Sequence, residues 1–146
     1  MAAIVPLVTK MINLQRIFLW QEKKDIMAEH IEKGKKSEEI AADWLRDQGY
    51  KIICTNFRFN KKEIDIITRK EDLLIFVEVK TKSFWSNESP GDIVTFKKQK
   101  FLFKAAEAYM MYHGIDRETR FDVIFVVYKH EEIMIEHIMD AFSPLG

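Results

Sequence analysis

The sequence predicts an α/β fold, a central mixed sheet flanked by helices, with a core in the order α-β-β-β-α-β and one further strand. Short apolar segments rich in β-branched and aromatic residues alternate with two longer segments of helical periodicity. Breaks of only a few residues separate the first three apolar segments, which favours antiparallel hairpins. A chain of 146 residues, 47% hydrophobic and 32% charged, is long enough for one domain with its own core.

The first half of the domain is predicted to hold one helix and three strands. The helix begins near Glu29 and ends at Gly49, because glycine readily takes the left-handed conformation that follows a helix. Three extended segments come next and cover Lys51–Arg58, Glu63–Arg69 and Leu73–Lys82. The short polar breaks between these segments predict that neighbouring strands are joined as hairpins.

The second half is predicted to hold one more helix and two strands. Thr95 is suited to cap the N-terminus of a helix that runs to about His113. Two strands follow, the almost continuously apolar Phe121–Tyr128 and then Ile133–Ile138. At the entry of the first of these strands, Arg120 and Asp122 are expected to form a structural pair.

Residues 1–28 are predicted to be an N-terminal extension to the domain, which covers residues 29–146. Apolar residues at helical spacing allow a weak amphipathic helix, and they are Leu7, Met11, Leu14 and Phe18. The alternatives are a disordered segment or a mis-assigned start, with translation beginning at Met27. Polar residues interrupt the apolar run, so this segment is too short and too polar to span a membrane.

Net charge and cysteine content restrict the classes of function. Twenty-three basic and twenty-three acidic residues balance, which disfavours strong, indiscriminate binding to nucleic acid but leaves room for a local basic groove. Cys54 is the single cysteine, so the chain has no internal disulfide and no cysteine-based zinc site. A reducing cytoplasmic compartment is therefore expected. The four histidines have no partners at metal-ligand spacing and are expected to be structural or exposed.

The strongest sign of chemistry is a pair of charged residues that follows an unbroken apolar run. Leu73–Val77 predicts a strand buried on both faces, and it leads directly to Glu78 and Lys80. Residues two apart in a strand share a face, so these two side chains point the same way. Asp65, in the preceding apolar segment, supplies a second carboxylate if the strands pair. Because buried charges are unfavourable unless paired or bound to metal, the pattern predicts a divalent-cation site beside a phosphodiester.

The same residues suit metal-assisted hydrolysis. Mg²⁺ prefers oxygen ligands and keeps several waters, so Asp65, Glu78 and Glu38 are the candidate ligands. Glu38 is expected to face the sheet from the first helix because of its spacing from the apolar residues that follow it. Lys80 is expected to position the attacking water or to hold phosphate oxygens in the transition state. The alternative is that Glu78 and Lys80 form an ordinary surface pair at a frayed strand end.

Six short motifs occur in an order that resembles a known family. They are Gly34–Ala41, Gly49-Tyr50, Asn56-x-Arg58, Glu63–Ile67, Phe76–Lys80 and Arg120–Val123. Through them the chain resembles the YraN-like uncharacterised protein family, over essentially the whole predicted domain. That family is similar to archaeal Holliday-junction resolvases and belongs with the PD-(D/E)xK nuclease superfamily. The resemblance therefore implies a restriction-endonuclease-like core.

The resemblance also marks a site and its cofactor. Carried over position by position, it selects Glu38, Asp65, Glu78 and Lys80, the same residues that the charge pattern selects. Nucleases of this kind imply Mg²⁺ or Mn²⁺ as cofactor. Ser37 and Lys62 stand where the family usually has glycine, which alters backbone freedom beside the site but removes no catalytic group.

Basic side chains around the predicted site are candidates for nucleic-acid binding. They are Arg58, Lys62, Lys82 and Lys98. Lys98 matches a lysine of the family and is expected to contact phosphate, although a run of lysines on a helix is more often a solvated face. Glu63 is expected on the same strand face as Asp65, either as an outer partner of the metal ligands or as a solvated strand end.

Together these features predict a cytoplasmic metal-dependent endonuclease that hydrolyses DNA phosphodiesters, with branched DNA among its candidate substrates. A symmetric homodimer is the simplest arrangement if both strands are cut. The alternative is a non-catalytic DNA-binding or scaffold protein that retains the nuclease fold, which neutral net charge favours, and a protein–protein adaptor is a third. Inward-facing carboxylates favour the enzyme. The sequence leaves DNA against RNA, and endonuclease against exonuclease action, open.

Overall fold

The computed structural model describes residues 28–83 and 94–144 of the chain. The chain divides into two units, Met1–Lys35 and Lys36–Gly146. In the first unit the described residues are helical and largely exposed, and Lys33 pairs with Glu29 at 3.3 Å. The expected extension, residues 1–28, lies outside the described residues except for its last residue, so its nature stays a prediction.

The second unit contains a five-stranded sheet and its flanking helices. Its elements are helical residues 36–47, β1 (Lys51–Phe59), β2 (Lys62–Lys70), β3 (Leu73–Ser83), α3 (Phe96–His113), β4 (Thr119–Lys129) and β5 (Glu132–Ile138). This order confirms the predicted α-β-β-β-α-β-β succession and is consistent with a restriction-endonuclease-like core. Strand ends differ from the predicted ones by one or two residues.

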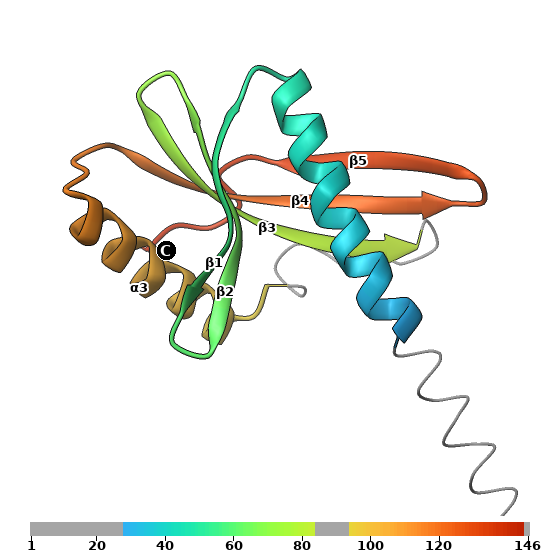
Figure 1. Ribbon diagram of the computed structural model, residues 1–146, viewed down its shortest axis with the longest axis horizontal. Helices are drawn as coiled ribbons and strands as arrows, with labels where there is room; N and C mark the ends of the chain where they lie inside the picture. Colours follow the sequence, from blue (N-terminus) through green and yellow to red (C-terminus); the bar gives the residue numbers. More distant parts are fainter. Residues whose placement is uncertain (1–27, 84–93, 145–146) are drawn as a thin grey trace, which may run out of the picture. The chain divides into compact units, whose positions relative to one another are not determined.

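The sheet has the strand order β1-β2-β3-β4-β5 and is mixed, as predicted. β3 and β4 are parallel, joined by a crossover that includes α3, and every other neighbouring pair is antiparallel. The strands twist strongly, so that the β1–β2 hairpin stands across the direction of β4 and β5 (Figure 1).

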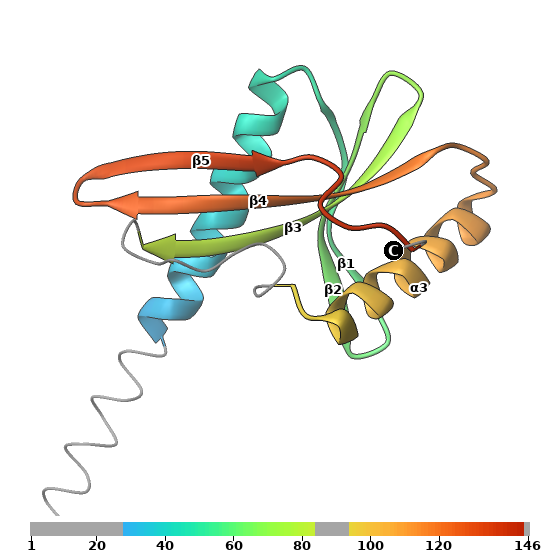
Figure 2. The ribbon, with the colours of Figure 1, turned by 180° about the vertical axis from the view of Figure 1, so that it is seen from behind.

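Two apolar clusters cover the two faces of the sheet. On one face Leu102, Ala105 and Tyr109 of α3 pack with alternate residues of the central strands. On the other face Ala41 and Leu45 of the first helix pack against the residues of the same strands that alternate with the first set. The opposite placement can be followed in Figure 1, where residues 36–47 lie in front of the strands, and in Figure 2, where α3 does. The central strands β2, β3 and β4 are therefore buried on both sides, which explains their continuous apolar runs, whereas the edge strands are more exposed.

The predicted helix ends are confirmed. Gly49 has a φ of 84°, the left-handed conformation expected after the first helix. Thr95 caps α3, since its Oγ1 accepts a hydrogen bond from the Lys98 backbone N–H at 3.3 Å. This cap fixes the backbone of the first turn of α3, from which the Lys98 side chain extends.

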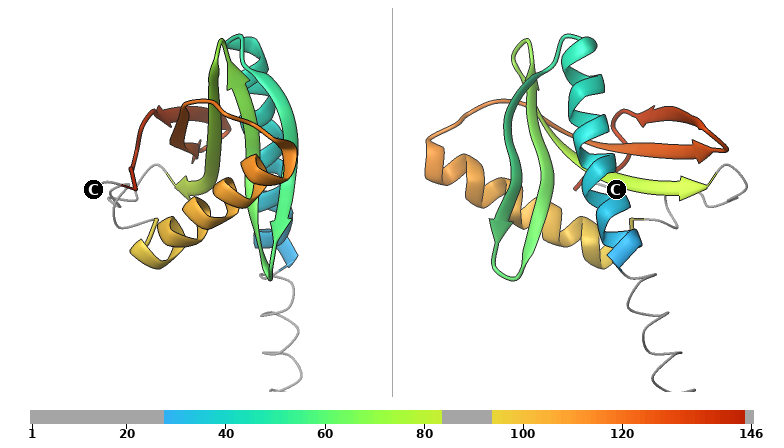
Figure 3. Two further views of the ribbon diagram at one scale, coloured as in Figure 1. Left: turned by 90° about the vertical axis from the view of Figure 1, so that its left-hand side faces the viewer. Right: turned by 45° about the vertical axis from the view of Figure 1, so that its right-hand side comes forward.

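The pairing of β2 with β3 stops at Ile66 opposite Val77. The β1–β2 pairing continues to Phe59 opposite Lys62, so the hairpin leaves β3 at this point, and Figure 3 shows it standing apart from the end of β3. We call this divergence the sheet fork. It begins at Asp65, where a carboxylate takes the place of the next rung of the ladder.

Candidate active site

Asp65 and Glu78 are the two buried carboxylates at the sheet fork. Their exposed fractions are 8% and 3%. Asp65 Oδ2 accepts a hydrogen bond from the Val79 backbone N–H at 2.7 Å, so the acid is bound to the strand that carries Glu78. The adjacent placement that the sequence predicted for these two strands is confirmed.

Two lysines from different elements approach Glu78. Lys80 Nζ lies 3.3 Å from Glu78 Oε1, which agrees with the shared face expected for residues two apart in a strand. Lys98 Nζ, from the first turn of α3, lies 3.3 Å from Glu78 Oε2. This second contact is an ion pair without hydrogen-bond geometry, because Oε2 is buried and accepts no hydrogen bond from any described residue.

The electrostatics of Asp65 show how crowded the site is with negative charge. Burial, followed by repulsion from Glu78, raises the pKa of Asp65 from 3.8 to about 8. Glu38 also raises the pKa of Asp65, whereas the Val79 hydrogen bond and the charge of Lys98 act to lower it. In the absence of a bound cation, Asp65 therefore holds a proton at neutral pH.

Glu38 approaches the same site from the helix on the other face of the sheet. It is half-buried, and its influence on the pKa of Asp65 places it within electrostatic reach. The preceding residue, Ser37, is 1% exposed and accepts a hydrogen bond from the Thr81 hydroxyl at 2.7 Å. Ser37 Oγ also lies 3.3 Å from the Tyr128 hydroxyl. This hydroxyl network holds the helix turn that carries Glu38 against β3 and β4.

The fit of a divalent cation can be judged from these carboxylates. Within residues 28–83 and 94–144, no three Asp, Glu, His or Cys side chains stand close enough to hold a metal ion. Asp65 and Glu78 nevertheless fit a cation that keeps most of its waters, because Glu78 Oε2 is a buried acceptor without a donor. Lysine ammonium groups, and not a third carboxylate, complete the surroundings of Glu78. The three-carboxylate ligand set stays a prediction.

The remaining predicted residues lie around the site in different states. Arg58 is exposed and pairs with Glu63 at 3.7 Å, so the contact seen for Glu63 is with an arginine of β1. Lys62 Nζ lies 5.6 Å from the centre of the Phe101 ring. Lys82 pairs with Glu136 at 3.1 Å and lies over Phe125, which leaves its side chain only 15% exposed. Arg58 and Lys62, on the hairpin, are thus more accessible than Lys82.

A second buried charge cluster lies on the other face of the sheet, around Asp122, which is paired with Val77 of β3. The Arg120–Asp122 pair expected from the sequence is present, with Arg120 Nε 2.7 Å and Nη2 2.8 Å from the carboxylate. His137 Nε2 lies 2.7 Å from Asp122 Oδ2, and the Asp140 backbone N–H donates to Oδ1 at 3.0 Å. Burial alone would raise the pKa of Asp122, but the bonds with His137 and Arg120 outweigh it and the pKa is lowered.

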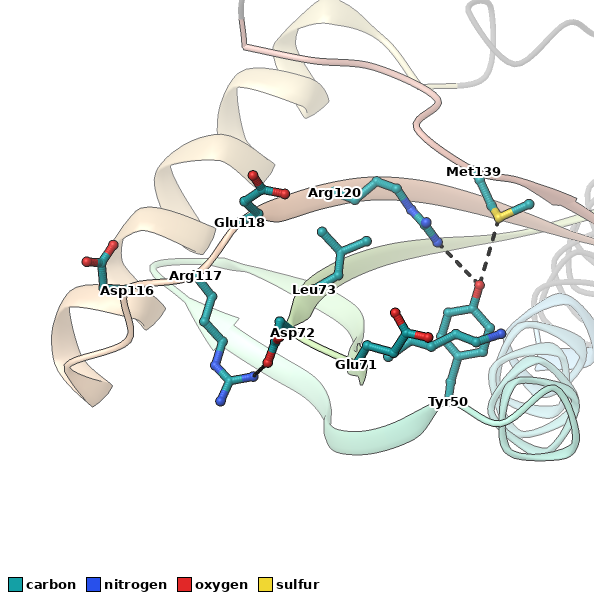
Figure 4. A pocket seen from close by; sticks show the side chains of 10 residues that line it. Tyr50, Glu71, Asp72, Leu73, Asp116, Arg117, Glu118, Arg120 and Met139 are labelled. Carbon is teal, nitrogen blue, oxygen red and sulfur yellow. Dashed lines mark hydrogen bonds and ion pairs between the residues drawn. The ribbon is translucent and has the colours of Figure 1, made fainter.

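A cavity of about 750 Å³ opens beside this cluster (Figure 4). At its wall, Arg120 and Met139 both point at the Tyr50 hydroxyl, which donates to the methionine sulfur and accepts from the arginine. Its charged lining residues are Lys70, Glu71, Asp72, Asp116, Arg117, Glu118 and Arg120. Acidic groups outnumber basic ones there, which disfavours this cavity as a place for a phosphodiester.

The contacts that the sequence did not predict are those of Ser37 and Lys98 and, in the second charge cluster, that of His137 with Asp122. Ser37 was recognised only as a replacement for glycine, and no periodic pattern marks its bonds to Thr81 and Tyr128. Lys98 was expected to contact phosphate, and here it contacts Glu78.

Among the residues that the structure describes, no helix is long and apolar enough to cross a membrane.

Comparison with known proteins gives a consistent result. The sequence model of the family described as "Uncharacterised protein family UPF0102" matches residues 37–126. A UPF0102 protein of Flavobacterium psychrophilum is 45% identical over 116 residues, which are 80% of this chain and 98% of the relative. Similar proteins of Christiangramia forsetii and Chlorobium phaeobacteroides are 43% and 44% identical, covering 80% and 75% of this chain and 98% and 92% of the relatives.

Proposed function

The chain belongs to the uncharacterised protein family UPF0102, and from this premise we propose that it is a Mg²⁺- or Mn²⁺-dependent endonuclease that hydrolyses DNA phosphodiesters. The observation that carries the proposal is the buried pair of carboxylates, Asp65 and Glu78, at the sheet fork beside Lys80. A structural core gains nothing from two close, repelling acids that cost free energy to bury. Such a pair is instead typical of sites that bind a cation.

The roles proposed for the residues follow from where they lie. Asp65 and Glu78 would hold the cation, with Glu38 as a further ligand or a partner of its waters. When bound, the cation would activate a water molecule and neutralise charge on the scissile phosphate. Lys80, half-buried beside Glu78, would orient that water and bind a phosphate oxygen in the transition state.

Substrate binding is proposed to use the β1–β2 hairpin. Arg58 and Lys62 border the fork, and a shallow cavity of about 230 Å³ lies between residues of the hairpin tip. A separated hairpin with accessible basic groups suits a branched or distorted DNA backbone, since phosphate contacts need position and charge but no base readout. Branched DNA is therefore the substrate that we would test first.

Two further proposals concern the compartment and the oligomeric state of the protein. A single cysteine without a disulfide partner in the sequence suits the reducing cytoplasm, where DNA is also found. A symmetric homodimer would place one site on each strand of a duplex or junction.

The second candidate function is a non-catalytic DNA-binding or scaffold protein that retains this fold. Two observations favour it: the formal net charge is zero, and both oxygens of Glu78 are already close to lysines. The raised pKa of Asp65 argues against this second function, because DNA binding alone does not require a buried carboxyl group beside Glu78.

Cleavage of linear duplex, single-stranded and four-way-junction DNA separates the two functions. We expect cutting in Mg²⁺ or Mn²⁺ that chelator abolishes and that Glu78→Gln and Lys80→Met each reduce at least ~100-fold. Glu107→Gln serves as the matched control, since that acid is exposed on α3 and has no role in the proposed site. If no DNA is cut and all variants bind junctions equally well in chelator, the binding function replaces the nuclease.

A further inference from the structure

Lys98 holds a position that its helix alone does not explain. Its side chain is only 25% exposed, and it reaches from the first turn of α3 to Glu78 on β3. Its charge also acts on Asp65, whose pKa it lowers. The ammonium group thus lies within electrostatic reach of both carboxylates that would hold a cation.

The contact between Lys98 and Glu78 compensates charge without forming a hydrogen bond. Lys98 Nζ is 3.3 Å from Glu78 Oε2, and that oxygen accepts no hydrogen bond from any residue in the described part of the chain. A geometrically poor ion pair loses little when the lysine leaves, provided that another cation takes over the charge of the buried carboxylate. Another cation could therefore replace Lys98 beside Glu78 at little cost in free energy.

The surroundings of Lys98 allow its side chain to move while its backbone stays in place. Its backbone N–H is held by the Thr95 cap at 3.3 Å. In the position beside Glu78, its ammonium also lies 5.5 Å from the centre of the Phe101 ring, a further weak contact for the positive charge. A four-carbon stem with one exposed side can swing from Glu78 towards solvent without disturbing α3.

We propose that Lys98 is a built-in counter-cation that competes with a divalent cation for Glu78 and, once released, binds substrate phosphate. The proposal rests on the proposed function and adds a coupling to it. Without a polyanion, Lys98 stays on Glu78 and weakens cation binding. With DNA present, the phosphate draws Lys98 away and the carboxylate pair binds the cation more tightly. Because such coupling is reciprocal, the cation also strengthens DNA binding.

Lys80 does not fit this role equally well. It also lies 3.3 Å from Glu78, but on Oε1 and from the same strand, two residues away. Its position is set by the strand itself, so it remains beside the site in both states. Lys98 comes from a separate element, and the Glu78 oxygen that it faces is fully buried.

The test is calorimetric titration of Mn²⁺ into the full chain, with and without a short duplex whose phosphorothioate linkages resist hydrolysis. Lys98→Met is the main variant and Lys97→Met the matched control, because Lys97 is an exposed neighbour on the same helix turn. We expect Lys98→Met to bind Mn²⁺ about tenfold more tightly than wild type without DNA, a usual size for coupling between two ligands. The duplex should raise the affinity of wild type and Lys97→Met, and leave that of Lys98→Met nearly unchanged.

Each outcome decides one of the two proposals. If folded Lys98→Met and Lys98→Gln bind Mn²⁺ no more tightly than wild type, the counter-cation proposal is wrong. The proposed function still stands in that case, provided that wild type binds Mn²⁺. If Lys98→Met binds Mn²⁺ and wild type does not, the counter-cation proposal is supported in its strongest form. If neither protein binds Mn²⁺, both proposals are wrong. Thermal unfolding of each variant establishes that the compared proteins are folded.

Discussion

Replacing Asp65 by asparagine should stabilise the metal-free protein. Burial, followed by the repulsion that an ionised Asp65 would feel from Glu78, raises the pKa of Asp65 from 3.8 to about 8. Asparagine keeps an oxygen that can accept the Val79 backbone hydrogen bond seen at 2.7 Å, while the charge is removed. We therefore expect Asp65→Asn to be more stable than wild type.

The size of this gain and its pH dependence follow from the raised pKa. Below pH 3.8 the carboxyl is protonated in both folded and unfolded protein, so Asp65 costs nothing. Between that value and about pH 8 the folded protein keeps a proton that the unfolded chain releases, so stability falls as pH rises. At ~1.4 kcal/mol per pH unit the cost reaches about 4 kcal/mol at pH 7. Because the amide must also be buried, we expect a gain of about 2–4 kcal/mol there.

Urea unfolding followed by circular dichroism, in chelator and across this pH range, measures the effect. The difference between Asp65→Asn and wild type should be near zero at pH 4 and grow towards pH 8. Glu63→Gln is the control, because that carboxyl is 42% exposed and paired with Arg58, and it should change stability little. An Asp65→Asn protein no more stable than wild type at pH 8 would refute the argument that the carboxylates oppose each other.

Three further predictions concern the cation, the second charge cluster and the hydroxyl network. Mn²⁺ at ~100 times its dissociation constant should stabilise wild type by about 2.7 kcal/mol in thermal melts, and Glu78→Gln should lose this gain. Asp122→Asn should destabilise the protein by about 3 kcal/mol, because Arg120 is left without its buried carboxylate. Since the pKa of Asp122 is lowered, its stabilisation should be present above pH 3.8 and lost as acid titration passes below it. Ser37→Ala should cost about 1 kcal/mol in urea unfolding, because the part-buried hydrogen bond from Thr81 is lost.

Each of these predictions has an outcome that contradicts it. Equal Mn²⁺ stabilisation of wild type and Glu78→Gln would place the cation elsewhere. An Asp122→Asn protein as stable as wild type would mean that Arg120 finds another partner. An unchanged Ser37→Ala protein would show that the hydroxyl network contributes nothing net, and Ser83→Ala provides a control at an exposed serine.

The parts of the fold that sequence could predict are those controlled by neighbours along the chain. Alternation placed Glu78 and Lys80 on one face, and their 3.3 Å contact agrees with it. Thr95 and Gly49 marked helix ends because capping depends on a few adjacent backbone groups. Short breaks predicted the antiparallel hairpins for the same reason.

The contacts between separate elements could not be predicted in the same way. The apolar pattern of α3 indicates which side packs on the sheet, but not the rotation and shift that bring Lys98 to Glu78. Arg120 and Asp122 were paired correctly, since they share a strand face, whereas the bond with His137 depends on the register between β4 and β5. The sequence predicted that Glu38 faces the sheet, but not how close it comes to Asp65. That approach depends on the sheet fork, which no sequence pattern indicated.

The two charge clusters have unequal consequences for how this family can change over time. In the Asp122 cluster both carboxylate oxygens are bonded, and none of these bonds involves Asp65 or Glu78. A lineage that loses Asp65 would keep its sheet and fold more robustly, so decay of the site would meet no structural resistance. Members without these acids are then expected to fold well, and chains that keep the pair bear its cost in stability.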